Sequence, residues 1–253
     1  MFAVISAMDR EIVALRRLLS NRQMGSFMDM NVIEGKLGKR NIVTATTGVG
    51  RGKSREIVDY LCANYKPDAL VCSGYAGATS QKLNPGDLVV LSRVHLLQGN
   101  TFDNNLTGTL DNVESDLGLL TSARRIIGNS SIPAYEGEGV TVPNILRHPS
   151  LKQLLGERLR VSVVDMESYW VASASANNGV PFLGVRAVTD PVVLRIPEVA
   201  TMIDEYGNSS IAKVLVNFLR KPSDIYPLLR IAGNARLATR HLTDFLVNFV
   251  SAY

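Results

Sequence analysis

Short apolar runs alternate along the chain with segments whose apolar residues recur every three or four positions, which predicts an α/β protein. Strands are expected at the apolar runs, at residues 2–6, 30–37, 40–47, 69–73, 88–92, 136–142, 161–164 and 182–189. Helical spacing follows the first strand, begins again after residue 54, and recurs near 117–127 and at 149–159. Gly38 and Lys39 join the strands at 30–37 and 40–47 as a hairpin.

The stretch from residue 161 to 190 predicts a βαβ unit, around which the expected site is organised. A helix of about twelve residues, rich in Ala and Ser, separates its two strands and ends near Gly179 and Pro181. Crossovers of this kind join neighbouring parallel strands, so Glu167 and Asp190 are both expected at the carboxyl end of the sheet. Two acids would then face one crevice.

Three further strand ends carry acidic or glycine-rich tips: residues 8–11, which include Glu11, residues 48–50 and residues 74–77. Each has a simpler interpretation. An acid in the first turn of a helix complements the helix dipole, and a glycine-rich tip can be only a tight turn. Taken with residues 166–167 and 189–190, these tips predict a crevice with acids and exposed backbone. Such a crevice suits a neutral or hydroxyl-rich small molecule that is cleaved by acid–base chemistry.

Histidine is nearly absent from the expected crevice, because the chain contains only His95, His148 and His241. A Ser-His-Asp triad is therefore not expected, and carboxylates would carry the proton transfers. No spacing of Cys and His fits a metal site, so no metal is expected.

Two other segments leave alternatives open. Residues 103–112 are rich in Asn, Gly, Thr and Asp and predict a surface loop, which is either a lid or an inter-subunit element. Residues 209–219 predict a helix, residues 221–223 a break, and residues 224–250 a long helix with a basic face. One interpretation is that this basic face meets a membrane surface. The other, which is favoured, is that the helix packs on the domain or on a second subunit.

Length and composition fit a single domain over residues 1–253 with a C-terminal helical extension at about 222–253, because 46% of the residues are hydrophobic. The net charge of +4 comes from scattered basic residues, so no nucleic-acid partner is expected. Cys62 and Cys72 lie in or beside apolar runs, which favours reduced thiols and a cytoplasmic protein. Since no stretch reaches eighteen apolar residues, no membrane insertion is expected.

The chain resembles the nucleoside phosphorylase/nucleosidase superfamily from residue 1 to about 220. The motifs that carry the resemblance are Ala-Met-Asp-Arg-Glu at 7–11, Ser-Gly-Tyr-Ala-Gly at 73–77, Asn-Pro-Gly-Asp at 84–87, Val-Asp-Met-Glu-Ser at 164–168 and Val-Arg-Ala-Val-Thr-Asp at 185–190. The pattern is most similar to that of the methylthioadenosine/adenosylhomocysteine nucleosidases. The sequence Asp190-Pro191, the break at 220–223 and the long terminal helix resemble instead the hopanoid-associated phosphorylases of the same superfamily.

The resemblance implies roles for the acids in cleaving the N-glycosidic bond of a purine nucleoside, most simply an adenine nucleoside with a 5′ substituent. Glu167 would bind the ribose hydroxyls, Asp190 would protonate purine N7, and Glu11 would polarise the attacking water. The other substrate contacts implied are Met8, Gly48, Gly50, Tyr75, Ala76, Gly77, Ile145, Met166 and Thr189. Tyr75 stands where the family has a small residue, and the segment around Ile145 lacks the aromatic residue that the family places over the base.

The nucleophile is either water or inorganic phosphate. A phosphorylase of this superfamily needs arginines for the anion; Arg10 stands at one such position and Arg51 is a further candidate, but Cys72 replaces the second arginine. Hydrolysis is therefore preferred, with phosphorolysis as the rival and a non-catalytic nucleoside-binding protein as an alternative of another class. No cofactor is implied, apart from inorganic phosphate as co-substrate of a phosphorylase. The resemblance also implies a homo-oligomer, most simply a homodimer. Together these features predict a three-layer α/β/α fold with a twisted, mostly parallel mixed central sheet.

Overall fold

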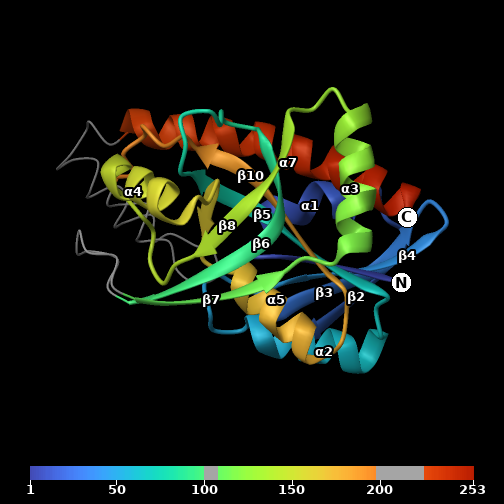
Figure 1. Ribbon diagram of the computed structural model, residues 1–253. Coiled ribbons are helices and arrows are strands. Elements are labelled where there is room, and N and C mark those ends of the chain that lie inside the picture. Colours follow the sequence, from blue (N-terminus) through green and yellow to red (C-terminus); the bar gives the residue numbers. More distant parts are fainter. Residues whose placement is uncertain (100–107, 198–224) are drawn as a thin grey trace.

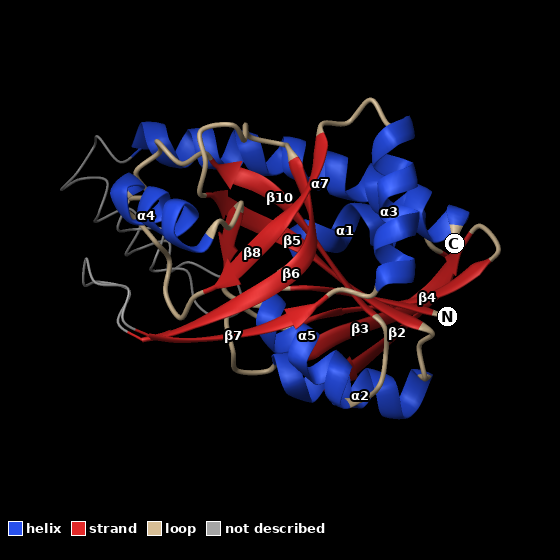
Figure 2. Cartoon of the chain, in the orientation of Figure 1, coloured by secondary structure: helices blue, strands red, loops and turns tan. Residues whose placement is uncertain are grey.

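The computed structural model describes residues 1–99, 108–197 and 225–253, and in these residues a mixed sheet carries helices on both faces (Figure 1, Figure 2). The strands are β1 Phe2–Ser6, β2 Ser20–Phe27, β3 Met30–Leu37, β4 Arg40–Thr46, β5 Ala69–Ala78, β6 Leu88–Gly99, β7 Gly108–Glu114, β8 Ala134–Thr141, β9 Val163–Asp165 and β10 Phe182–Asp190. The helices are α1 Asp9–Leu18, α2 Ser54–Tyr65, α3 Leu117–Asn129, α4 Pro149–Leu159, α5 Ser168–Asn177 and α7 Ile225–Ala252. The predicted three-layer fold with a mixed central sheet is confirmed.

Parallel pairs form the middle of the sheet and antiparallel pairs extend it. Strands β4, β1, β5 and β10 are parallel neighbours in that order. Strands β3 and β2 add antiparallel pairs at one edge, while β10 continues antiparallel into β6. Strand β10 pairs with β5 as well as with β6, so β5, β9, β8, β6 and β10 close into a ring of strands.

The predicted adjacency of the two strands in the βαβ unit is wrong. Strand β5 lies between β9 and β10; it is antiparallel to β9 and parallel to β10. Strand β9 has only three residues and enters beside the carboxyl end of β5, where Val164 is opposite Gly77. Asp190 at the end of β10 is opposite the same glycine. The two acid-bearing segments therefore meet at Gly77 from opposite directions.

Backbone pairing also explains the other departures from the predicted elements. Strand β2 was not expected because its residues are exposed and polar, yet it pairs along β3. Residues 108–112, predicted to be a surface loop, instead begin β7, which pairs antiparallel with β6. Strand β5 runs on through residues 74–77 because β9 and β10 both bond to it there. Residues 103–107, the helix predicted at 209–219 and the break at 221–223 lie outside the described residues.

The helices cover the two faces of the sheet with separate apolar cores. Helices α2 and α5 pack on one face, and α1, α3 and α7 on the other (Figure 1). The long helix α7 buries Leu242, Phe245, Leu246 and Phe249 in the second core, and His241 Nδ1 lies 2.7 Å from the carbonyl oxygen of Gly86. Helix α7 thus packs on the domain, which is one of the two placements preferred over a membrane surface. No helix among the described residues is long and apolar enough to cross a membrane.

We predict that α7 contributes to stability through its buried face. Leu246→Ala should lower the free energy of unfolding by about 2–5 kcal/mol, because the removed side chain is buried and leaves a cavity. Leu229→Ala is the matched control on the same helix; its side chain is 67% exposed, so the change should stay within about 0.5 kcal/mol. Denaturant unfolding of both variants measures this, and equal losses would contradict the packing of α7.

Candidate functional site

One cavity of about 210 Å³ lies where the ends of β1, β5, β9 and β10 meet. Most of its wall is apolar, and four carboxylates interrupt that wall. The lining residues are Ala7, Met8, Arg10, Glu11, Val49, Tyr75, Ala76, Gly77, Val142, Asn144, Ile145, Leu146, Lys152, Val164, Asp165, Met166, Glu167, Thr189, Asp190, Ile196 and Ile231. The structure therefore brings eleven of the predicted site residues to one wall: Met8, Arg10, Glu11, Tyr75, Ala76, Gly77, Ile145, Met166, Glu167, Thr189 and Asp190.

Glu11 both caps a helix and lines the cavity. Its Oε2 accepts a hydrogen bond from the backbone N–H of Met8 at 2.9 Å, which closes the first turn of α1. Its Oε1 accepts from the backbone N–H of Tyr75 in β5, also at 2.9 Å. Burial raises the pKa of this carboxyl group, against the opposing effect of the Tyr75 and Met8 amides and of Arg186. Glu11 thus lies in the first turn of α1, as its simpler interpretation expects, and it lines the cavity as well.

Glu167 lies at the start of α5 and reaches across to the loop after β4. The backbone N–H of Gly50 donates to its Oε1 at 2.8 Å. Gly50 has φ of +87°, a left-handed conformation that favours glycine and aims this amide at the carboxylate. Burial raises the pKa of Glu167 to about 7, although Arg186 acts to lower it. Near neutral pH this side chain is therefore close to the point where it gains or loses its charge.

A buried ion pair supports the carboxylates from behind the cavity. Arg186 Nε lies 2.8 Å from Asp165 Oδ2, and its N–H points to the hydroxyl oxygen of Ser168, also at 2.8 Å. Burial disfavours the charged guanidinium of Arg186. The surrounding acids, of which Asp165 has the largest effect, outweigh burial, so the pKa of Arg186 is raised. Asp165 Oδ1 accepts from the hydroxyl of Thr141 at 2.7 Å and from the backbone amides of Glu167 and Ser168. This pair therefore fixes the turn that presents Glu167.

Asp190 lies at the end of β10, also lines the cavity, and is held by a lysine. The ammonium of Lys152, on α4, donates to Asp190 Oδ2 at 2.5 Å, while the hydroxyl of Thr189 donates to Oδ1 at 3.1 Å. A Cβ atom at Gly77 would lie only 2.6 Å from Asp190 Oδ2. Glycine is thus required at 77 because the carboxylate approaches the β5 backbone closely.

Three predicted residues do not line the cavity. In the loop after β4, Val49 lines it rather than Gly48 or Gly50, although Gly50 acts through its bond to Glu167. The Arg51 guanidinium stacks over the ring of Trp170, 4.7 Å from its centroid, which directs it away from the cavity.

Arg10 and Cys72 bear on the choice of nucleophile. Arg10 is exposed at the cavity wall, where its Nη2 lies 3.0 Å from the sulfur of Met8 and its guanidinium lies 5.9 Å from the centre of the Tyr75 ring. Cys72 is buried beside Arg186, and burial raises the pKa of its thiol to about 12. A neutral thiol at this position holds no anion.

Lys152, Asp165 and Arg186 were not predicted as site residues. A signal for Arg186 existed, because a lone arginine inside the apolar run 182–189 has to be paired when the strand is buried. Lys152 carried no comparable signal: in a predicted surface helix a lysine is ordinary. Among residues 1–99, 108–197 and 225–253 no group of three or more His, Cys, Asp or Glu is placed to hold a metal ion.

Comparison with known proteins identifies relatives that are similar in sequence or in fold. The 5′-methylthioadenosine/S-adenosylhomocysteine nucleosidase of an Exiguobacterium species is 26% identical over 194 residues, which is 74% of this chain and 83% of that protein. The nucleosidase of the same name from Neisseria meningitidis, solved with methylthio-immucillin-A, superposes with a TM-score of 0.77 at 19% identity, over 100% of this chain and 99% of that one. Futalosine hydrolase of Helicobacter pylori gives a TM-score of 0.76 at 17% identity, over 100% and 97% of the two chains.

Because the two solved structures are less than 20% identical to this chain, their similarity shows a shared fold and nothing more. The family is shown by the amino-acid sequence. Residues 1–217 match the family model of the phosphorylase superfamily, which spans most of the 253 residues. The chain therefore belongs to the phosphorylase superfamily.

Proposed function

We propose that this protein is an enzyme that hydrolyses the N-glycosidic bond of a purine nucleoside carrying a 5′ substituent. The observation that carries the proposal is the meeting of Glu11, Glu167 and Asp190 in one cavity from three separate parts of the chain. Mere binding of a nucleoside does not need three buried acids, whose desolvation is costly. Relatives named as nucleosidases and as a hydrolase support the same chemistry.

On the sugar side, Glu167 is proposed to accept hydrogen bonds from the ribose hydroxyls. One of its oxygens is held by the Gly50 amide, so the carboxylate has a fixed direction. An ionised carboxylate near the sugar also stabilises the positive charge that develops as the glycosidic bond breaks. Glu11, held by two backbone amides, is proposed to orient the attacking water and take up its proton; the raised pKa favours this uptake.

On the base side, Asp190 is proposed to deliver the proton that the purine ring needs in order to leave. The charge that develops on the departing base makes it a poor leaving group unless a proton neutralises it. The apolar side chains of Met8, Met166 and Ile231 would surround the rest of the nucleoside, which suits a substituent with apolar character at the 5′ position. This chemistry calls for no cofactor.

Phosphorolysis remains the second candidate, because the exposed Arg10 guanidinium lies at the cavity wall. A phosphate dianion, however, would have to approach Glu11. Neither Cys72 nor Arg51 supplies a second positive charge to the cavity, and the Lys152 ammonium that lines it is already paired with Asp190. Hydrolysis is therefore the better-supported reaction. A cytoplasmic homodimer remains the expectation for the assembly, and size-exclusion chromatography with light scattering tests the oligomeric state.

The reaction is tested with purified protein in phosphate-free buffer. Adenosine, inosine, methylthioadenosine and adenosylhomocysteine are each followed for release of free base. We expect release of base with free ribose sugar as the second product, at a rate that added millimolar phosphate does not raise. A strict phosphate requirement with a ribose 1-phosphate product would establish the rival reaction, and binding without turnover would leave only a nucleoside-binding protein.

Asp190→Asn should lower turnover by roughly 10²–10⁴-fold, the range expected for a lost general acid. Asparagine keeps the shape of the side chain but has no proton of suitable acidity to deliver. Steady-state kinetics on the best substrate, with circular dichroism as the control for folding, measure the effect. Near-normal rates in a folded variant would remove Asp190 from the chemistry.

Glu167→Gln should weaken catalysis on ribonucleosides far more than on the matching 2′-deoxynucleosides. The reason is that the lost charge-assisted hydrogen bonds go to the sugar hydroxyls, one of which the deoxy substrate lacks. The measurement is the ratio of kcat/KM for the two substrates in wild type and variant. Equal losses on both substrates would place Glu167 outside the ribose site.

A further inference from the structure

The Lys152–Asp190 pair presents a difficulty for an acid catalyst. A general acid has to carry a proton when the base departs, but an ammonium 2.5 Å from a carboxylate favours the ionised carboxylate. Both side chains are buried: that of Lys152 is 1% exposed and that of Asp190 12%. A proton for the base can therefore come from the lysine nitrogen, which is the donor in contact with Asp190.

The surroundings of Lys152 favour a role in the site over a purely structural one. Besides Asp190 Oδ2, its ammonium contacts only the carbonyl oxygen of Leu194 among the described residues, at a long 3.5 Å. Lys152 also lines the cavity, although it belongs to α4, whose other buried side chain is the apolar Leu155. Burying a lysine costs free energy that an apolar residue at this position would avoid.

Resting on the proposed function, we propose that Lys152 is a positioning residue that supplies, through Asp190, the proton that leaves with the base. As the bond between C1′ and N9 breaks, its electron pair moves to the base. One proton passes from Lys152 Nζ to the Asp190 carboxyl group and from there to N7. Water adds to C1′ and gives its proton to Glu11. The products are the neutral base and the free sugar, and Lys152 and Glu11 then exchange protons with solvent.

Few other titratable or charged side chains line the cavity around this pair. The other titratable or charged side chains that line the cavity are Arg10 and Glu11 of α1, Tyr75 of β5, and Asp165 and Glu167 on either side of the turn after β9. Protonation of Glu167 would govern the acid limb of activity, near pH 7. The alkaline limb of activity would report the supply of a proton to the base.

The first test is the pH profile of kcat/KM for Lys152→Met. In this variant only Asp190 is left to supply the proton, and since a carboxylic acid is in general a much stronger acid than an ammonium, the alkaline limb should move to lower pH. The acid limb should stay in place. A merely structural role would lower the thermal stability of the variant and leave both limbs where they are.

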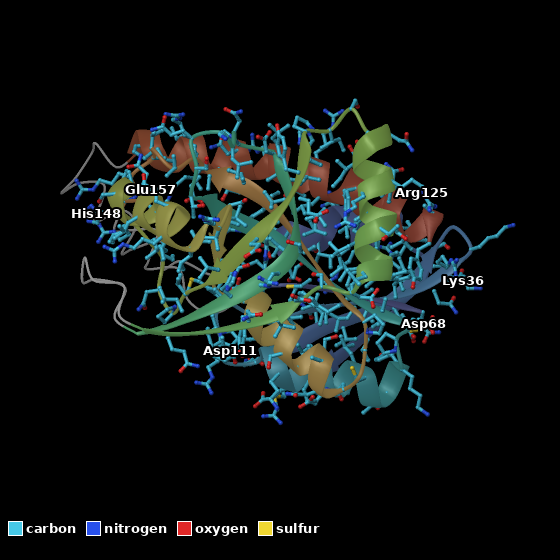
Figure 3. The ribbon with its side chains drawn as sticks, viewed as in Figure 1. Lys36, Asp68, Asp111, Arg125, His148 and Glu157 are labelled. Carbon is cyan, nitrogen blue, oxygen red and sulfur yellow. The ribbon has the colours of Figure 1, made fainter. Side chains whose placement is uncertain are left out.

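Two further variants separate proton supply from charge and packing. Lys152→Arg keeps the positive charge, but a guanidinium does not give up its proton, so kcat should fall about tenfold or more while KM changes little. Lys152→Ala opens space beside Asp190, and added methylamine or ethylamine should restore part of the lost kcat. Lys36→Ala is the surface control; Lys36 is exposed on β3 and lies on the side of the molecule opposite α4 (Figure 3).

The outcomes for Lys152 and for the proposed function are distinguishable. If the wild-type protein releases no base from any nucleoside, the proposed function fails and the role of Lys152 fails with it. Only the role of Lys152 is overturned if the wild type releases base but Lys152→Arg retains full kcat. The same holds if the wild type releases base, Lys152→Met keeps its alkaline limb and amines do not rescue Lys152→Ala. A shifted limb together with amine rescue supports it.

Discussion

The site depends on the burial of several carboxylates in one small cavity and on the two cations that make this burial tolerable. Taken as whole residues, Glu11, Asp165, Glu167 and Asp190 are each less than 9% exposed. Buried acids repel one another and lose hydration, so without compensation they would become protonated or force the cavity open. Arg186 compensates the group formed by Asp165, Glu167 and Glu11, and Lys152 compensates Asp190. Removing either cation would leave buried charge without a partner, which is far costlier than the loss of a surface ion pair.

The topology of the sheet places these groups. Strand β5 is the common neighbour: its tip donates an amide to Glu11, and its Gly77 is opposite both Val164 of β9 and Asp190 of β10. Strand β5 is one of the strands of the closed ring, and its Gly77 has no room for a side chain. A Cβ atom there would lie 2.6 Å from Asp190 Oδ2. A side chain added there would meet the Asp190 carboxylate first. Helix α7 contributes Ile231 to the wall of the cavity. On the same helix, the side-chain amide of Asn234 donates to the carbonyl oxygen of Thr189 at 2.7 Å.

Local sequence patterns predicted most of the elements and most of the cavity wall, and the reasons for the failures are specific. Strand β1 and helix α4 occur at their predicted bounds because their apolar spacing is decided locally. The order of β9, β5 and β10 was not predictable, because it depends on pairing between segments about 90 and 110 residues apart in the chain. The polar strands β2 and β7 are held by backbone bonds to a neighbour, which side-chain patterns do not reveal. Lys152 was missed for a related reason: its partner, Asp190, lies 38 residues away in the chain.

The central claim is that one cavity holds the sugar at Glu167 and the base at Asp190. A crystal structure with a non-hydrolysable nucleoside analogue, in which an iminoribitol replaces the ribose, tests it most directly. The expected result is a ligand whose sugar hydroxyls lie within hydrogen-bond distance of Glu167, with a ring nitrogen of the base at Asp190 and Lys152 still bound to that carboxylate. A ligand bound outside the cavity, or one with its base against Glu167 and its sugar at Asp190, would contradict the claim.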